Sequence, residues 1–180
     1  MSYDPEKHDR QSIRLPDYAY GQPGRYFVTV CPHGRTYLFG AVVDGRMGLD
    51  AYGRVVAEEW RRTERIRDNV ALDAFVVMPN HVHGIIGITH RSDRRRSEPQ
   101  FAPARDFKSP SQTLGAIVRG FKGAATRRIN RHRGTPGEPV WQRNYYEHIV
   151  RGRRDLQRIR RYIRQNSARW HRDRNHPERT

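Results

Sequence analysis

The stretch VALDAFVVMPNHVHGIIGIT, residues 70–89, predicts two strands of a β-sheet. Both halves are rich in apolar and β-branched residues, which favour extended backbone. Pro79 and Asn80 separate the halves, and this pair is typical of a turn. We therefore expect two consecutive antiparallel strands joined by a tight connection.

Two histidines, His81 and His83, begin the second of these strands and flank Val82. Side chains alternate between the faces of a strand, so both imidazoles point the same way while Val82 points into a core. Such a pair is half of a metal site, or equally two surface histidines on a half-buried strand. Two ligands leave a divalent ion undersupplied, so the metal interpretation requires a further ligand elsewhere.

The rest of the chain alternates strand and helix patterns. The order strand, helix, strand, strand, helix, strand is typical of an α+β, ferredoxin-like sandwich, with an antiparallel sheet and helices on one face. An extra C-terminal helix, which bears a tyrosine, follows the last strand. The expected elements are a strand at 25–31, a hairpin at 39–49 turning at Asp44-Gly45, a helix at 50–69, the strand pair at 70–89, a helix from Ser109 with Pro110 in its first turn, a strand at 145–150 and a helix at 153–166.

Composition shifts divide the chain into segments. Residues 1–24 are polar and contain several Pro and Gly, which predicts an N-terminal arm. The domain itself is expected at 25–170. Within it, residues 91–108 have no periodicity and predict a flexible basic loop. Residues 171–180 predict a polar tail that is frayed beyond Trp170.

The charge is concentrated in the second half of the chain. There are 35 basic and 19 acidic residues, a net charge of +16. Residues 1–89 carry 11 of each sign, whereas residues 90–180 carry 24 basic and 8 acidic groups. So lopsided a distribution favours a polyanionic partner, of which nucleic acid is the commonest.

Other classes of protein are disfavoured by the sequence. No apolar run approaches the roughly 20 residues of a membrane span, and the first residues, MSYDPEKHDR, lack the apolar stretch of a signal peptide. The single cysteine, Cys31, forms no internal disulfide, which fits a reducing cytoplasm. We expect a cytoplasmic protein with no membrane partner.

The last helix offers groups that could complete a metal site. Tyr162 and Asn166 are four residues apart and share one face of the helix. The Asn166 carbonyl oxygen is a hard ligand suited to Mg²⁺ or Mn²⁺, and the Tyr162 phenol could act as a nucleophile beside the metal. The alternative is an ordinary amphipathic helix with Tyr162 at the edge of its apolar stripe.

Taken together, these motifs resemble those of a known family. MPNHVHG, an arginine-rich helix, VWQRNYYEHIV and RRYIRQN are similar to motifs of the REP-associated tyrosine transposases, which are single-tyrosine HUH endonucleases related to insertion-sequence transposases. GRYFVTV and GRTYLFG resemble the first strand of that family and the loop that follows it. The resemblance covers residues 12–170, nearly the whole chain.

The resemblance implies roles for individual residues. His81 and His83 match the histidine pair that binds a divalent ion, Mg²⁺ or Mn²⁺. Tyr162 matches the nucleophilic tyrosine, and Asn166 matches the polar residue that completes the metal site. Ser167 departs from the pattern, because family members usually have proline there. The resemblance therefore does not predict the residue at which the helix ends.

Tyr145 and Tyr146 are rival candidates for the nucleophile. They lie in a predicted strand, so only one of them can face the site. Neither has a metal-type ligand at a helical offset. We favour core or DNA-stacking roles for both.

The resemblance further implies cleavage of hairpin DNA, a repetitive extragenic palindrome, through a 5′-phosphotyrosine intermediate in the nucleoid of a bacterium. Residues 12–25 are expected to read a single-stranded tag on that DNA. Basic side chains on the second helix are expected to hold phosphates near the site, namely Arg119, Lys122, Arg127 and Arg128. The loop arginines Arg94, Arg95 and Arg96 are expected to grip a hairpin stem, and Arg25 is a further expected DNA contact.

Two alternatives of other classes stay open. A catalytically silent protein could use the same fold and basic surface to bind hairpin nucleic acid. A zinc-type hydrolase would need a carboxylate beside the histidine pair, for which Asp73 on the adjoining strand is the nearest candidate. The protein could be a monomer or a homodimer, and the tyrosine helix could act in its own subunit or in its partner.

Overall fold

A computed structural model describes residues 22–89 and 113–176 of the chain. The strands are β1 (Gly24–Val30), β2 (Gly40–Val43), β3 (Arg46–Leu49), β4 (Val70–Met78), β5 (His81–Ile88) and β6 (Tyr146–Ile149). The helices are α1 (Ala51–Arg65), α2 (Leu114–Arg133) and α3 (Gly152–Gln165), with short 3-10 helices η2 (His33–Arg35) and η5 (Ser167–Arg172).

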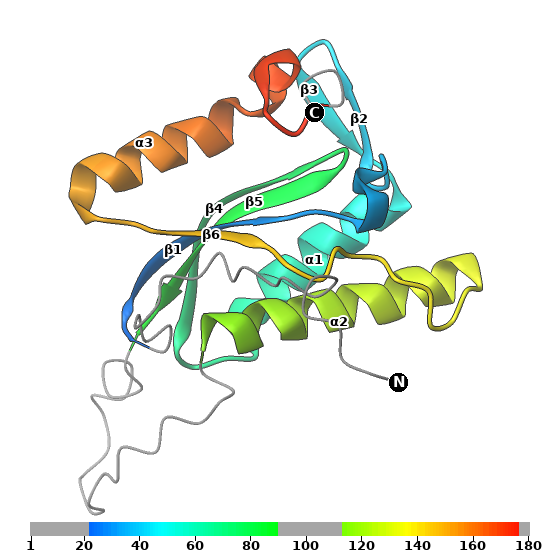
Figure 1. The fold of residues 1–180 in the computed structure, drawn as a ribbon, viewed down its shortest axis with the longest axis horizontal. Coiled ribbons are helices and arrows are strands. Elements are labelled where there is room, and N and C mark those ends of the chain that lie inside the picture. The colour runs from blue at the N-terminus through cyan, green and yellow to red at the C-terminus, as the bar shows by residue number, and fades with distance from the viewer. Residues whose placement is uncertain (1–21, 90–112, 177–180) are drawn as a thin grey trace, which may run out of the picture.

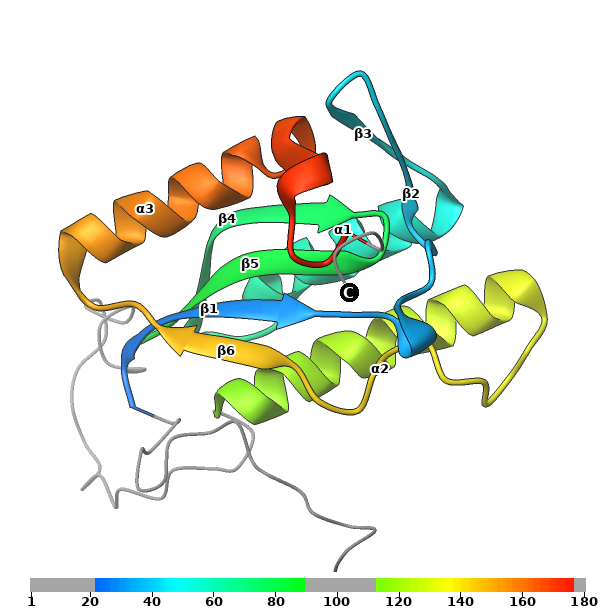
Figure 2. The same ribbon diagram turned by 45° about the horizontal axis from the view of Figure 1, so that its top comes forward.

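The main sheet has four strands in the order β4-β5-β1-β6, and every neighbouring pair is antiparallel. Helices α1 and α2 cover one face of it, whereas α3 lies across the opposite face (Figures 1 and 2). Strands β2 and β3 form a separate hairpin. The predicted α+β, ferredoxin-like sandwich with an additional tyrosine-bearing helix is therefore confirmed.

The central strands β1 and β5 contribute side chains to both faces of the sheet. Tyr26 and Val28 of β1 and Val82 of β5 belong to the larger core beneath α1 and α2. Phe27 of β1 and Ile85 of β5 belong to a smaller core beneath α3. The alternation predicted for the stretch 81–89 is thus the feature that gives the sheet two different faces.

The first helix and the hairpin before it follow the predicted local signals. Asp44 and Gly45 both have positive φ, 49° and 71°, as a tight hairpin turn requires. Asp50 caps α1, because its carboxylate accepts a hydrogen bond from the N–H of Gly53 at 2.7 Å.

The start of α2 differs from the prediction. The Thr113 hydroxyl accepts a hydrogen bond from the N–H of Ala116 at 3.2 Å, and the helix begins directly after it, at Leu114. The predicted start near Ser109 is therefore wrong, because a threonine cap sets the first turn. Ser109 and Pro110 themselves lie outside the described residues.

Helix α3 is attached to the sheet by apolar contacts and one ion pair. Leu156, Ile159 and Ile163 pack against the smaller core, as the helical stripe predicts. Arg160 forms a two-pronged ion pair with Asp73 of β4, with its Nε 2.9 Å from Oδ1 and its terminal nitrogen 2.7 Å from Oδ2. The Asp73 carboxylate, which was the candidate ligand of a zinc-type hydrolase, is therefore engaged by Arg160.

The segment after α3 is ordered, contrary to expectation. Helix η5 continues from Ser167 in place of the stop that a proline would give. Trp170 packs against the ring of His81, with centroids 5.8 Å apart, and Asp173 and Asn175 are buried. The prediction of fraying beyond Trp170 is therefore wrong up to residue 176, because polar side chains there bury themselves against the sheet.

Several predicted segments lie outside the described residues. These are most of the N-terminal arm, the basic loop at 91–108 with Arg94, Arg95 and Arg96, and the last four residues. Within residues 22–89 and 113–176, no helix has both the length and the apolar character needed to cross a membrane.

Gly84 allows α1 to pack closely on the sheet, and its replacement by alanine tests that packing. A Cβ at this position would lie 2.2 Å from the buried ring of Trp60. We expect Gly84→Ala to lower the free energy of unfolding by about 1–3 kcal/mol in denaturant titrations. Gly48→Ala is the matched control, because its added Cβ meets the nearest atom at 3.6 Å. Equal stability of both variants would contradict this account of the packing.

Candidate metal and tyrosine site

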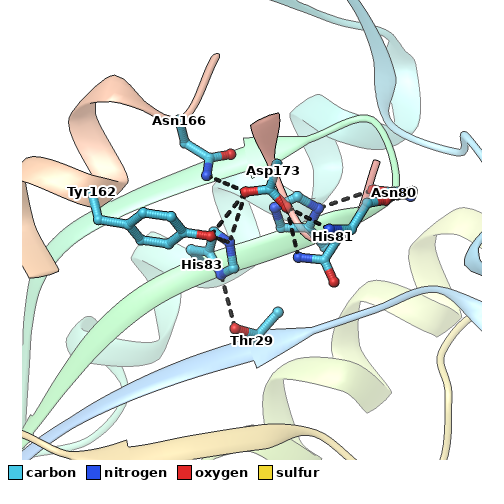
Figure 3. A network of polar contacts seen from close by, with 8 residues as sticks. Thr29, Asn80, His81, His83, Tyr162, Asn166 and Asp173 are labelled. Carbon is cyan, nitrogen blue, oxygen red and sulfur yellow. Dashed lines mark hydrogen bonds and ion pairs between the residues drawn. The ribbon is translucent and has the colours of Figure 1, made fainter. Parts of the chain in front are cut away.

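The two histidines lie side by side on the face of β5 that α3 covers. Both side chains are fully buried, and their ring centroids are 4.3 Å apart. The alternative that they are surface histidines on a half-buried strand is therefore wrong. Figure 3 shows them at the centre of a network of polar groups from β1, β5, α3 and the segment after η5.

The hydrogen bonds of His81 fix which of its ring nitrogens is free. Asn80 donates its amide N–H to the Asn175 carbonyl at 2.8 Å, so its Oδ1 is the atom that accepts. His81 Nδ1 lies 2.9 Å from that oxygen and donates to it. The Nε2 lone pair of His81 is then exposed to the site, and among the described residues it has no hydrogen-bond partner.

The His83 ring lies between two hydroxyl groups. Its Nδ1 is 2.9 Å from Thr29 Oγ1 on β1, and its Nε2 is 3.0 Å from the Tyr162 hydroxyl. A threonine hydroxyl can donate or accept, so Thr29 supports either neutral tautomer of His83. The Nε2 atom can therefore change from donor to lone-pair ligand without losing the bond at Nδ1.

Helix α3 brings Tyr162 and Asn166 to the histidines, as their spacing predicts. Tyr162 is 37% exposed, so its ring reaches the surface while its hydroxyl points inward. Asn166 is buried, and its amide N–H donates to Asp173 at 2.6 Å. That bond makes Asn166 Oδ1 an acceptor, and this oxygen also has no hydrogen-bond partner among the described residues.

Asp173 is the candidate metal ligand that the sequence did not predict. Its Oδ2 accepts hydrogen bonds from Tyr162 at 2.9 Å and from Asn166 at 2.6 Å. Its Oδ1 accepts from the backbone and the side-chain N–H groups of Asn175, at 2.7 and 3.0 Å. Asp173 stands in a polar segment without periodicity, so no sequence pattern singles it out.

Burial and the Asp173 carboxylate set the charges of the site. Burial lowers the pKa of both His81 and His83 below the usual imidazole value, so both are neutral near pH 7. Burial and the nearby carboxylate raise the pKa of Tyr162 above that of a free phenol. Burial alone would raise the pKa of Asp173, but the His83 imidazole 3.8 Å away and the hydrogen bond from the Asn175 backbone hold it below the ordinary range.

The donor set fits a divalent cation. Ligand atoms of His81, His83 and Asp173 lie within 4.8 Å of one another. Asn166 lies close enough to influence the pKa of His81, and its Oδ1 and the His81 Nε2 are buried acceptors without donors. Buried acceptors left unpaired are costly, and a cation would satisfy them. Two imidazoles with carboxylate and amide oxygens match the ligands of Mn²⁺ and related ions.

The rival tyrosines are separated by the sheet. Tyr145 packs against the larger core, and the Lys122 ammonium lies 5.6 Å from its ring centroid. Tyr146 lies on the α3 side, with its ring 6.3 Å from that of Phe27. Adjacent strand residues face opposite ways, as expected, and only Tyr146 borders the site.

The basic residues predicted on α2 do not lie near Tyr162. Helix α2 covers the other face of the sheet, because its apolar stripe packs into the larger core (Figure 2). The expectation that these groups hold phosphates beside the tyrosine is therefore wrong, and a DNA-binding role elsewhere stays a prediction. The residues concerned are Arg119, Lys122, Arg127 and Arg128.

Two of these basic groups have structural partners, whereas others are exposed. Lys122 Nζ donates to the carbonyls of residues 142–144 at 2.8–3.3 Å, and burial lowers its pKa to about 8. Arg128 pairs with Glu58 at 2.6 Å and with Glu59 at 2.9 Å. Arg25, Arg119 and Arg127 are exposed.

The chain was compared with protein-family models, curated proteins and solved structures. No family model matches the chain. An uncharacterized protein of Haemophilus influenzae is 38% identical over 168 residues, which cover 92% of each chain. The solved structure of a REP-associated tyrosine transposase bound to a REP hairpin is 20% identical, with a TM-score of 0.57, covering 87% of this chain and 74% of that one. The chain therefore belongs to the family of the Haemophilus influenzae protein, and the resemblance of its motifs to the REP-associated tyrosine transposases is confirmed in its fold.

Proposed function

We propose that this protein cuts and rejoins single-stranded DNA by means of Tyr162 and a divalent metal. The observation that carries the proposal is the convergence of the Tyr162 hydroxyl, 3.0 Å from His83 Nε2, on a buried group of unpaired acceptors. A nucleophile and a cation site within hydrogen-bond reach of each other are the minimum that phosphoryl transfer to a side chain requires.

The metal would be held by His81 and His83, with oxygen ligands from Asn166 and Asp173. A divalent ion bound there supplies positive charge to a non-bridging phosphate oxygen and to the phenolate form of the tyrosine. The resemblance implies Mg²⁺ or Mn²⁺, and the two imidazole ligands favour Mn²⁺.

The chain's own residues prepare the nucleophile. Tyr162 donates its phenolic proton to Asp173 Oδ2, which is therefore the nearest acceptor when the proton leaves. The Tyr162 oxygen forms a bond to phosphorus while the bond from phosphorus to the 3′ oxygen breaks. That oxygen takes up one proton, which balances the proton that Tyr162 gave to Asp173, and leaves as a 3′-hydroxyl. One phosphoester replaces another, so a second 3′-hydroxyl can reverse the step and join a new strand.

Positive charge around α3 supports DNA as the substrate. The exposed side of this helix carries five arginines, and it lies on the same face of the sheet as Tyr162. These groups are better placed than α2 to hold phosphates near the tyrosine. They are Arg153, Arg154, Arg158, Arg161 and Arg164.

Hairpin DNA of the REP type is the substrate that the resemblance and the structural relative favour. The relative was solved with a REP hairpin bound. Helix α3 packs on the sheet of its own chain, which supports action as a monomer with the tyrosine in the same subunit.

A silent hairpin-binding protein is the second candidate. It is favoured by the state of the nucleophile, because the Tyr162 hydroxyl is already bonded to both His83 and Asp173. Such a protein would bind hairpins through the same basic surface without forming an adduct.

A covalent-adduct assay tests the proposed reaction. Labelled hairpin oligonucleotides with single-stranded flanks, incubated with Mn²⁺, are expected to give a protein–DNA band on denaturing gels. Tyr162→Phe and His81→Ala should abolish the band, because they remove the nucleophile and a metal ligand. Tyr145→Phe is the matched control and should retain it, since Tyr145 packs in the other core.

Each other outcome of that assay has a defined meaning. A band that persists in Tyr162→Phe would move the nucleophile to another residue. Free 5′-phosphate product with zinc and no adduct would indicate a hydrolase. Tight hairpin binding across several palindromes without any adduct would favour the silent binding protein.

A change at Thr29 tests the orientation of His83 through metal binding alone, without DNA cleavage. Thr29→Val removes the hydroxyl at His83 Nδ1 while keeping the side-chain shape. Loss of a group that orients a ligand imidazole typically weakens metal affinity by about 10–100-fold, and we expect this for Mn²⁺ in isothermal titration calorimetry. Thr63→Val is the control, because that buried hydroxyl bonds to Glu59 O on α1. Unchanged affinity in Thr29→Val would remove His83 from the metal site.

Because the pKa values of both histidines are lowered, we expect the metal affinity to depend less on pH than that of an ordinary pair of imidazoles. Two imidazoles of ordinary pKa lose affinity by roughly tenfold or more between pH 7.5 and 6.0, because both must be neutral to bind. Here both pKa values lie below the usual one, so protons compete only at lower pH. We therefore expect the Mn²⁺ affinity to fall by clearly less than tenfold over this interval. A tenfold loss in calorimetric titrations would show that the imidazoles titrate normally.

A further inference from the structure

A hollow opens beside Tyr162 and shares Asp173 with the candidate metal site. It has a volume of about 320 Å³ and lies between β1, β6, α3 and the segment after η5. Phe27, Tyr146 and Tyr162 line it, together with arginines from two segments. Its size is at the lower end of small-ligand sites, which suits a single planar group with its sugar and excludes a base pair.

Three aromatic rings line part of this hollow. Phe27 lies between the two tyrosines, edge-on to each, with centroids 6.3 Å from Tyr146 and 6.1 Å from Tyr162. Tyr146 is 36% and Tyr162 37% exposed, and both are among the few large apolar side chains that the described residues leave at the surface. Exposed rings at the rim of a hollow favour a flat, apolar ligand.

Cationic groups also line the hollow. The Arg174 guanidinium lies 4.7 Å from the centroid of the Tyr146 ring. Arg158 also lines the hollow, and it pairs with Asp155, which in turn accepts from His148. The lining carboxylate, Asp173, already accepts four hydrogen bonds. The ligand that fits therefore has a planar group joined to a negatively charged group.

We propose that this hollow binds one unpaired nucleobase of the DNA, next to the phosphate that Tyr162 attacks, with Tyr146 and Arg174 as its stacking surface. The proposal rests on the proposed function, because that function supplies both the single strand and the position of the phosphate. Stacking on aromatic rings and guanidinium planes is how proteins commonly hold unpaired bases. A base held there would align the adjoining phosphate with the Tyr162 oxygen.

Binding measured without cleavage tests this proposal. The hairpin oligonucleotides of the adduct assay, each with 2-aminopurine at one single-stranded position in turn, are titrated against the Tyr162→Phe protein. We expect fluorescence quenching at one position, from stacking. Tyr146→Ala in the same background should abolish the quenching and weaken binding by about 5–100-fold, whereas Tyr146→Phe should keep both.

A second change, in the DNA, separates stacking from folding. An abasic site at the quenched position should weaken binding to the parent protein as much as Tyr146→Ala does, and should add little in that variant. Tyr52→Ala, on α1 across the sheet, is the control and should bind normally. Melting temperatures identify any variant that fails to fold.

The outcomes distinguish this proposal from the function on which it rests. Adduct formation with no Tyr146-dependent position would overturn the base site and leave the nuclease intact. Quenching that is lost in Tyr146→Phe as well as in Tyr146→Ala would overturn stacking as its cause. A Tyr146-dependent position without any adduct would keep the base site and overturn cleavage.

Discussion

The pairing of β5 with β1 decides which way every side chain of the central sheet points. In this register His83 lies opposite Thr29, and Val82 lies opposite Val30. A slip of one residue would put both histidines into the larger core and bring Val82 to the site. The apolar residues under α1 and α2 hold the register, and so the same interaction that builds the core also positions the imidazoles.

The polar groups around those imidazoles leave two acceptors without hydrogen-bond donors among the described residues, and both acceptors face the same space. Asn80 fixes one nitrogen of His81, and Asp173 fixes the amide of Asn166, so each presents an unpaired acceptor to the same space. Lowered pKa values keep His81 and His83 neutral, which is the form that binds metal. Tyr162 lies at the rim of this group, with its hydroxyl inside and its ring at the surface.

Sequence patterns predicted the parts of this site that belong to regular elements. A period of two placed His81 and His83 on one face, and a helical spacing of four placed Tyr162 and Asn166 together. Asp173 escaped prediction because it lies beyond the last periodic element, where contacts between distant segments decide the structure. The position of α2 escaped for a related reason: amphipathic spacing identifies its apolar side but not the face of the sheet that it covers.

Crystals soaked in Mn²⁺ and measured at the manganese absorption edge would test the account most directly. It predicts one anomalous peak within bonding distance of the Nε2 atoms of His81 and His83 and of an oxygen from Asn166 or Asp173. Absence of a peak at saturating Mn²⁺, or a peak that lacks the two imidazoles as ligands, would contradict a metal-assisted tyrosine site on this face of the sheet.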